Sequence, residues 1–468
     1  MRTEILQTVE VANVGLATFG DALREQGAPV VDVDWSPPAE GDPDVLEVLT
    51  RLYGTHGDRV AEANRITVER IEAARPRAVA VEAAGDVIEG LTDRMLLHSG
   101  PPIEWDRVCD PQARALTAAC LLEGWASDRD EAARLIADGE VELASGNEHD
   151  HVGTMTGVCS PSMPVWVMED EDSGARAYAT LNEGPGKTFW LGVGDDESVE
   201  LQRFMKDRLA PVFEGLIEEM GPVDVFSLAA QGLQMGDELH MRSQATTNLL
   251  LRELLPALVV SGDRDVARFL AGNRHFFLGL TIAAAKCTAL AAAGERGSTI
   301  VHSISRNGTD FGLQVASMPG RWFEAPAPPV SDALLYEGYD EQDKALDIGD
   351  SAVIECVGLG GMTIGASPAV AGFFGGSAAD AVERTRVLAE ICGARSARFL
   401  IPALGYAGSG VGIDARLVVE LGITPQITTG VLHASSGAGQ IGAGVAHAPA
   451  EPFLAALSAV ADRLDEES

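Results

Sequence analysis

Lysine is scarce in this chain of 468 residues: it occurs at four positions, Lys187, Lys206, Lys286 and Lys344. Of the 34 cations the other 30 are arginines, and 70 acidic residues bring the formal net charge to −36. Such a field repels nucleic-acid backbones and anionic membrane surfaces, which argues against both as partners. An acidic excess with few lysines is typical of proteins adapted to molar salt, where a Debye length of about 3 Å screens the self-repulsion. We therefore predict a halophilic protein.

Long apolar runs, a leader peptide and paired cysteines are also missing. No segment has the roughly 18 consecutive apolar residues of a membrane span. Residues 1–10 lack a basic stretch followed by an apolar core, so no secretory signal is expected. The six cysteines are far apart and never spaced C-x-x-C, which argues against both a zinc ribbon and a disulfide scaffold. These features predict a cytoplasmic protein with reduced thiols.

The beginning of the chain has the pattern of a parallel α/β unit. An apolar, β-branched run at 9–14 is followed by a helical pattern at 16–26 and a second strand pattern at 30–35. The intervening turn, Asn13 to Gly15, is not a G-x-G-x-x-G motif, so dinucleotide binding is unsupported. At about 150 residues per domain, the length suggests about three domains.

We predict a multidomain α/β protein with three parts. Residues 1–145 form an N-terminal Rossmann-like α/β domain with a parallel sheet. Residues 146–196 and 297–468 form a mixed, β-rich α/β domain with Gly-rich loops. Residues 197–296, in which five helical patterns follow one another, form an all-helical insertion.

Two motifs admit both a functional and a plain structural interpretation. His149 and His151 have the H-x-H spacing of a metal pair on an extended segment, but no third ligand is visible, so a polar loop is the better interpretation. The run from Gly184 to Thr188 ends in G-K-T, as a phosphate-binding loop does. Leu181 stands where that motif needs its first glycine, so a turn is the better interpretation.

Further polar segments stand at predicted element boundaries. Asp237 is placed to cap a helix that would bring His240 and Asn248 near one face. Asn273 could cap the next helix, with His275 at its positive end. Asn307-Gly308 between two β-like runs is a strong hairpin signal, and Arg306 beside it could reach an anion. Glycine tracts at 358–361 and 437–442 could let a phosphate approach or could serve packing alone.

Taken together, these segments resemble one protein family. The matching stretches, in chain order, are NVGL near residue 13, MTGV and SPSMPVWV, ATLNEG, QMGDE, GN with HFFL, RNG, RWF, DIGDS and GQIGAG. They span residues 9–447 and are similar to the YlbE/YahG-like proteins. That family includes the AllG-type subunit of oxamate carbamoyltransferase in allantoin catabolism.

The resemblance implies a carbamoyl transfer between carbamoyl phosphate and oxamate that gives oxalurate and phosphate. It also implies an FdrA-like partner subunit, an oligomer, small anionic substrates and no cofactor or metal. Such chemistry needs donors for a phosphate, a carboxylate and a developing oxyanion, without a covalent nucleophile. The predicted catalytic residues are His149, His240, His275 and Arg306. The predicted substrate-binding residues are Ser160, Asn182, Arg242, Asn273, Asn307 and Arg321.

Two other functions stay open at this point. The chain could be a non-catalytic subunit that binds a small carboxylate and assembles with an FdrA-like partner. It could also be a metal-dependent amidohydrolase that uses His149 and His151.

Overall fold

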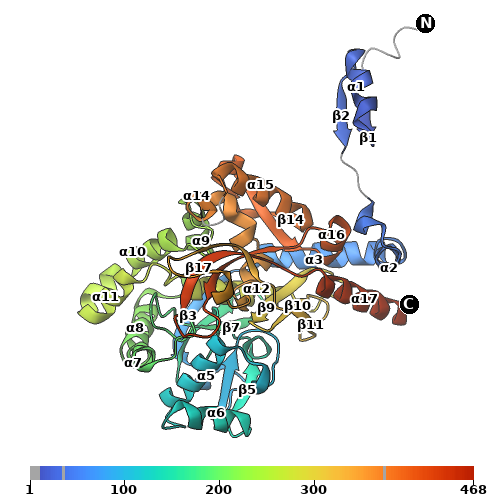
Figure 1. Ribbon diagram of the computed structural model, residues 1–468. Coiled ribbons are helices and arrows are strands. Elements are labelled where there is room, and N and C mark those ends of the chain that lie inside the picture. The colour runs from blue at the N-terminus through green and yellow to red at the C-terminus, as the bar shows by residue number, and fades with distance from the viewer. Residues whose placement is uncertain (1–10, 34–36, 373–375) are drawn as a thin grey trace. The chain divides into compact units, whose positions relative to one another are not determined.

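The structure, a computed structural model, describes residues 11–33, 37–372 and 376–468 (Figure 1). Contacts divide the chain into two compact units, Met1–Glu47 and Val48–Ser468. Helices alternate with parallel and antiparallel strands, so the predicted multidomain α/β class is confirmed. The boundaries predicted at 145, 196 and 296 stay a prediction. Within the described residues, no helix combines the length and apolar character that a membrane crossing needs.

The first unit is a strand–helix–strand motif. Strands β1 (Val11–Val14) and β2 (Val30–Val33) pair in parallel, and helix α1 (Ala17–Glu25) connects them. Asn13 Nδ2 donates to Asp32 Oδ1 across the two strands at 2.9 Å. The predicted parallel unit is thus confirmed within 11–33. The outer ends of both predicted strands, and the expected lack of a signal sequence in residues 1–10, lie outside the described residues.

Most sheets of the second unit are antiparallel. One has the order β7–β6–β3–β8, a second β11–β10–β9–β13, a third β12–β17–β16, and β14 pairs with β15; β4 and β5 pair in parallel. The strands are β3 (Pro76–Ala83), β4 (Met95–His98), β5 (Glu142–Ser145), β6 (Pro164–Asp170), β7 (Arg176–Thr180), β8 (Val223–Asp224), β9 (Val301–Asn307), β10 (Asp310–Val315), β11 (Phe323–Pro326), β12 (Val330–Leu335), β13 (Ile348–Gly349), β14 (Cys392–Ile401), β15 (Ala407–Ile413), β16 (Gln426–Leu432) and β17 (Gln440–His447).

Helices cover these sheets and follow one another between residues 196 and 292. They are α2 (Pro43–Thr50), α3 (Gly57–Ala73), α4 (Ala84–Val87), α5 (Asp110–Leu122), α6 (Arg129–Ala137), α7 (Asp196–Phe204), α8 (Ala210–Met220), α9 (Val225–Gln234), α10 (Gln244–Ser261), α11 (Arg264–Gly272), α12 (Leu278–Ala292), α13 (Val353–Cys356), α14 (Pro368–Ala371), α15 (Ala378–Leu388), α16 (Ala415–Leu421) and α17 (Glu451–Glu466).

Helix α12 is the centre of the main hydrophobic core. Its side chains are buried almost throughout, and it packs against β6, β7, α3, α9 and α13. A helix that is apolar on every side is a buried helix. A Cβ at Gly279 would lie 2.9 Å from the Thr180 carbonyl oxygen, so the helix begins in tight contact with β7. The loop just before it, with Asn273 and His275, is therefore firmly placed.

The predicted hairpin is confirmed: β9 and β10 pair on either side of Asn307-Gly308. Gly308 has φ +80°, which glycine adopts without strain. The Asn307 side-chain oxygen accepts the N–H groups of Thr309 and Asp310 at 3.0 and 2.6 Å. This side chain therefore closes the turn itself.

Candidate functional site

A small pocket in the second unit collects residues from widely separated segments. Its volume of ≈ 50 Å³ admits a few non-hydrogen atoms, which suits one end of a small substrate. Residues from several predicted motifs, around residues 155, 240, 275, 351 and 440, line this pocket. Its lining comprises Thr154, Met155, Trp190, Leu191, His240, Met241, His275, Leu278, Ser351, Thr429, Gly430 and Gln440.

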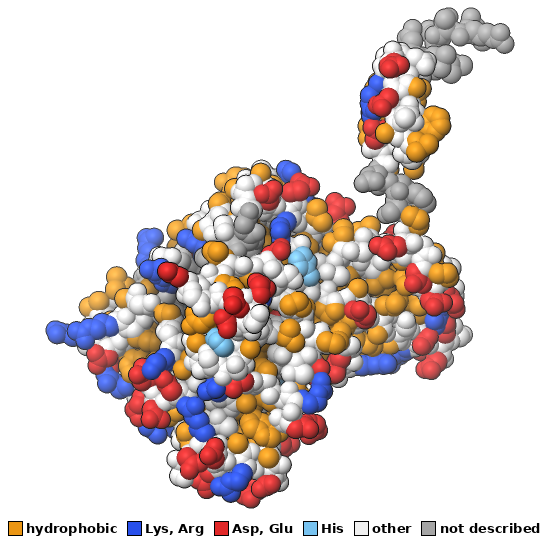
Figure 2. All heavy atoms as spheres, in the orientation of Figure 1, with side chains coloured by type: hydrophobic (Ala, Val, Ile, Leu, Met, Phe, Trp, Pro, Cys, Tyr) orange, Lys and Arg blue, Asp and Glu red, His pale blue; other side chains and the backbone are white. Residues whose placement is uncertain are grey.

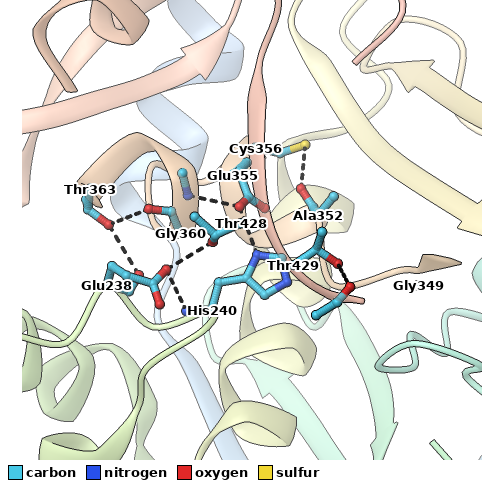
Figure 3. A network of polar contacts seen from close by, with 12 residues as sticks. Glu238, His240, Gly349, Ala352, Glu355, Cys356, Gly360, Thr363, Thr428 and Thr429 are labelled. Atoms are coloured by element: carbon cyan, nitrogen blue, oxygen red, sulfur yellow. Dashed lines mark hydrogen bonds and ion pairs between the residues drawn. The ribbon is translucent and has the colours of Figure 1, made fainter. Parts of the chain in front are cut away.

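His240 is held in the pocket wall by a buried carboxylate. Its Nδ1 lies 2.8 Å from Glu355 Oε1, and that oxygen also accepts the N–H of Gly361 at 2.9 Å (Figure 3). A carboxylate on Nδ1 favours the tautomer with its proton there, which leaves Nε2 as an acceptor. Within the described part of the chain, Nδ1 alone of this ring has a hydrogen-bond partner. The arrangement is that of an oriented general base.

Glu238 fixes the loop that carries His240. Its carboxylate accepts the N–H of His240 at 3.1 Å, the N–H of Arg242 at 2.5 Å and the hydroxyl of Thr428 at 3.1 Å (Figure 3). Burial is the main cause that raises the pKa of Glu238 to about 7. Near neutral pH this carboxyl therefore titrates while it holds the backbone N–H of His240.

Glycines let the chain close around this network. A Cβ at Gly360 would lie 2.4 Å from Glu355 Oε1, and one at Gly361 would lie 1.8 Å from the Gln426 carbonyl oxygen. The glycine tract at 358–361 thus serves close packing around Glu355. This is the structural alternative that the sequence left open.

The predicted helix start at Asp237 was wrong, because α10 begins at Gln244. Leu239 has φ +75°, a left-handed conformation that interrupts a helix. Asp237 still binds the first turn of α10: it accepts the N–H and the hydroxyl of Thr246 at 2.7 and 2.8 Å. It also accepts from Arg242 Nη1 at 2.5 Å, so one edge of that guanidinium is occupied.

His275 lines the pocket as a neutral ring. Its Nδ1 is buried without a partner among the described residues. Burial, aided by the charges of Arg274 and Arg242, lowers the pKa of His275 to about 4. A neutral imidazole can donate its N–H to a carbonyl oxygen without introducing a buried charge. His275 is thus suited to polarise a carbonyl.

The two predicted asparagines hold the loop that carries His275. Asn273 Nδ2 donates to the carbonyl and side-chain oxygens of Asn182 at 2.9 and 3.0 Å, and Asn273 Oδ1 accepts the N–H of His275 at 3.1 Å. Asn182 Oδ1 also accepts the N–H of Gly184 at 2.9 Å. Trp190 Nε1 donates to the Gly184 carbonyl oxygen at 2.9 Å. Through these hydrogen bonds, Asn182 and Asn273 link the segments that carry His275 and Trp190, two residues of the pocket wall.

Arg306 lies behind the pocket and does not line it. Its guanidinium is fully buried and donates to Asp347 at 2.6 and 3.1 Å and to the Gly349 carbonyl. Asp347 Oδ1 also accepts the hydroxyl of Thr429, a lining residue, at 3.0 Å. Arg306 therefore supports the pocket through Asp347, which differs from the direct catalytic role that the sequence suggested.

The remaining predicted residues lie outside the lining. His149 Nδ1 lies 3.0 Å from the Glu89 carbonyl oxygen, Ser160 donates to Glu123 at 2.5 Å, and Arg321 stacks over Phe323 at 5.1 Å. Neither ring nitrogen of the buried His151 has a hydrogen-bond partner within the part of the chain that the structure describes, and burial lowers the pKa of this ring to about 3. Among the described residues no group of three His, Cys, Asp or Glu side chains could hold a metal.

Glu355 is the functional candidate that sequence reasoning missed. It is a lone carboxylate within the apolar run from Val353 to Val357, and it is fully buried. A charge in such a run needs a partner inside the protein, and that signal was available. Thr429 had no comparable signal, because hydroxyls are common in strands; Ser351 lies in the DIGDS stretch, but nothing there singled out its hydroxyl.

Comparisons with known proteins agree on one family. Residues 141–351 match the family model described as oxamate carbamoyltransferase subunit AllG. The chain is 36% identical over 457 residues to the uncharacterized protein YahG of Escherichia coli K12, covering 96% of this chain and 97% of that protein. It is 38% identical over 413 residues to the oxamate carbamoyltransferase subunit AllG of the same strain, covering 86% and 98%.

A solved structure shares the fold. The crystal structure of a conserved protein of unknown function from Enterococcus faecalis V583 matches with a TM-score of 0.84 and 34% sequence identity. The match covers 86% of this chain and 98% of that one. Nine of the twelve pocket-lining residues fall within the segment 141–351 that the family model matches.

Proposed function

Because the chain belongs to the family of AllG and YahG, we propose that it is the subunit of an oxamate carbamoyltransferase that carries the base for the transfer. The observation behind this proposal is the pocket in which His240, oriented by Glu355, shares a wall with the neutral His275. The substrates in this proposal are taken from the name of the AllG relative. The two histidines of the pocket are groups that suit the chemistry of these substrates.

The proposed reaction forms one C–N bond and breaks one C–O bond. The amide nitrogen of oxamate attacks the carbamoyl carbon of carbamoyl phosphate, and the C–O bond to phosphate breaks with its electron pair on the phosphate. The nitrogen loses one proton, which the phosphate gains overall. The products are oxalurate and hydrogen phosphate, and the reverse reaction makes carbamoyl phosphate.

His240 is the proposed base. An amide nitrogen is a poor nucleophile, so removal of its proton during attack lowers the barrier. Nε2 of His240 is the ring atom without a partner among the described residues, and Glu355 stabilises the imidazolium that forms. General-base catalysis of this kind contributes roughly 10²- to 10⁴-fold in rate.

His275 is the proposed donor to the carbamoyl oxygen. Negative charge develops on that oxygen during attack, and a positioned donor in a dry site stabilises it. The neutral state of His275 follows from its pKa of about 4. The hydroxyls of Thr154, Ser351 and Thr429 line the same space and can add hydrogen bonds.

We further propose that the active enzyme is a complex with an FdrA-like subunit. The AllG relative is named as a subunit, which supports assembly with other chains. The alternative is a non-catalytic subunit that binds a carboxylate. In that role the oriented His240 would have no function as a base.

The test is the formation of a ureido product from carbamoyl phosphate and oxamate in molar KCl. The FdrA-like partner is assayed alone, and then with the full-length chain added. The proposal expects product that depends on this chain. Product at the same rate without it assigns the chemistry to the partner, and no product in either case rejects these substrates.

A further inference from the structure

A second cavity, next to the His240–His275 pocket, is lined by three cations. Arg114 comes from α5, Arg129 from α6 and Lys187 from the loop after β7, and the volume is ≈ 550 Å³. Leu191 and Gln440 line both cavities, so the two are neighbours. Only 34 of the 468 residues are cations, so three of them in the lining of one cavity is an unusual concentration in a chain of net charge −36.

Arg114 is fixed with one edge free. Its Nε and Nη2 donate to Asp110 at 2.6 and 3.2 Å, and Nη2 also donates to the Ser435 carbonyl at 3.0 Å. Nη1 has no hydrogen-bond partner among the described residues and faces the turn at Gly437, where an added Cβ would lie 3.0 Å from it. A guanidinium held in this way loses little side-chain entropy when it binds an anion.

The other two cations differ in their partners: Lys187 is paired with two carboxylates, whereas Arg129 has no acidic partner among the ion pairs of the described residues. Arg129 donates through Nη2 to the Gly194 carbonyl, an uncharged partner. Lys187 Nζ lies 2.9 Å from Asp195 and 2.9 Å from Glu197. Asp195 is the one acidic side chain that lines this cavity together with the three cations.

We propose that this cavity, the Arg114–Arg129–Lys187 subsite, binds the phosphoryl group of the carbamoyl donor. The inference rests on the proposed function. It adds the position at which the dianionic phosphoryl group would bind. The small pocket offers imidazoles and hydroxyls but no cation in its lining, so it suits the uncharged carbamoyl end. Cations favour the dianionic phosphoryl end. Leu191 and Gln440 line both cavities, which places the two ends of the donor side by side in this proposal.

The subsite is tested with inorganic phosphate on the full-length chain, by titration calorimetry at fixed ionic strength. Lys187→Gln and Arg129→Gln should each weaken phosphate binding at least about tenfold, the effect of one lost charge-assisted bond. Lys187→Arg keeps the charge and should retain binding. Lys206→Gln, which removes an exposed lysine that lines neither cavity, should bind phosphate as the unmodified chain does.

Competition between phosphate and each substrate shows which of them carries the group that binds in the subsite. Carbamoyl phosphate should displace phosphate, whereas oxamate should not. Unchanged binding in both Gln variants, no phosphate binding by the unmodified chain, or displacement by oxamate alone would overturn the subsite. Phosphate binding with the expected variant pattern, but no carbamoyl transfer with the partner present, would keep the subsite and reject the proposed reaction.

Discussion

At the scale of single residues, the site depends on two histidines in different environments. His240 is oriented by the Glu355 carboxylate, whereas Nδ1 of His275 is buried without a partner among the described residues. Both histidines could be predicted from the sequence, because each stands in a polar segment near a helix start. The carboxylate that distinguishes them could not be paired with His240, since 115 residues separate the two.

Glu355→Gln should lower kcat by at least about a hundredfold while the fold persists, because the amide no longer stabilises the Nδ1–H tautomer or the imidazolium. KM should change little, since Glu355 does not line the pocket. Steady-state kinetics of the reconstituted complex across pH 6 to 9 check this. A proportional loss in kcat and in folded protein would mean that Glu355 has a structural role alone.

His275→Asn should make stability less sensitive to acid. The pKa of His275 is lowered to about 4 in the folded chain, so the unfolded chain binds a proton that the folded chain does not between pH 6.5 and 4. Stability is therefore lost as pH falls through that window. Urea unfolding at pH 7 and pH 5 should show a smaller loss in the variant. An equal loss would contradict the assigned neutral state.

At the scale of elements, the sequence predicts helices and turns best where neighbouring residues alone determine the local structure. The β9–β10 hairpin follows from Asn307-Gly308, and the order of helices between 196 and 292 follows from apolar spacing. The start of α10 was misplaced because the left-handed Leu239 has no sequence signature. The sequence suggested Arg306 as an anion binder, and the hairpin signal does not reveal that Asp347 occupies its guanidinium.

Arg306→Ala should destabilise the fold by about 3–5 kcal/mol, because it leaves Asp347 buried without its partner. We expect lower expression and a lower unfolding midpoint rather than a folded, inactive chain. Denaturant titration measures this. Arg203→Ala removes an exposed ion pair with Glu200 and should cost less than about 1 kcal/mol. A stable Arg306 variant would refute the supporting role.

At the scale of the whole molecule, the pocket exists only because distant segments meet. Its lining extends from Thr154 to Gln440 and comes from loops, a helix start and two strands. The family resemblance indicated which segments matter, but not that the asparagines stand behind the pocket or that Ser160 and Arg321 lie outside it. Those facts depend on packing around α12, which no local pattern encodes.

The net negative charge also affects the stability of the whole molecule. Acidic side chains are spread over the visible face of the molecule among basic and apolar ones (Figure 2). With a net charge of −36, repulsion should weaken as salt rises. The melting temperature should therefore increase steadily from 0.1 to about 2 M KCl. A melting temperature that is flat or falls over this range would contradict the halophilic prediction.

The central claim is that His240 is the base of a carbamoyl transfer. The most direct measurement is kcat for oxalurate formation by the complex that contains His240→Asn, with His447→Asn as the matched control at a half-buried histidine that does not line the pocket. The account predicts a loss of at least about a hundredfold for His240→Asn and an unchanged rate for the control. Equal rates in both folded variants would contradict it.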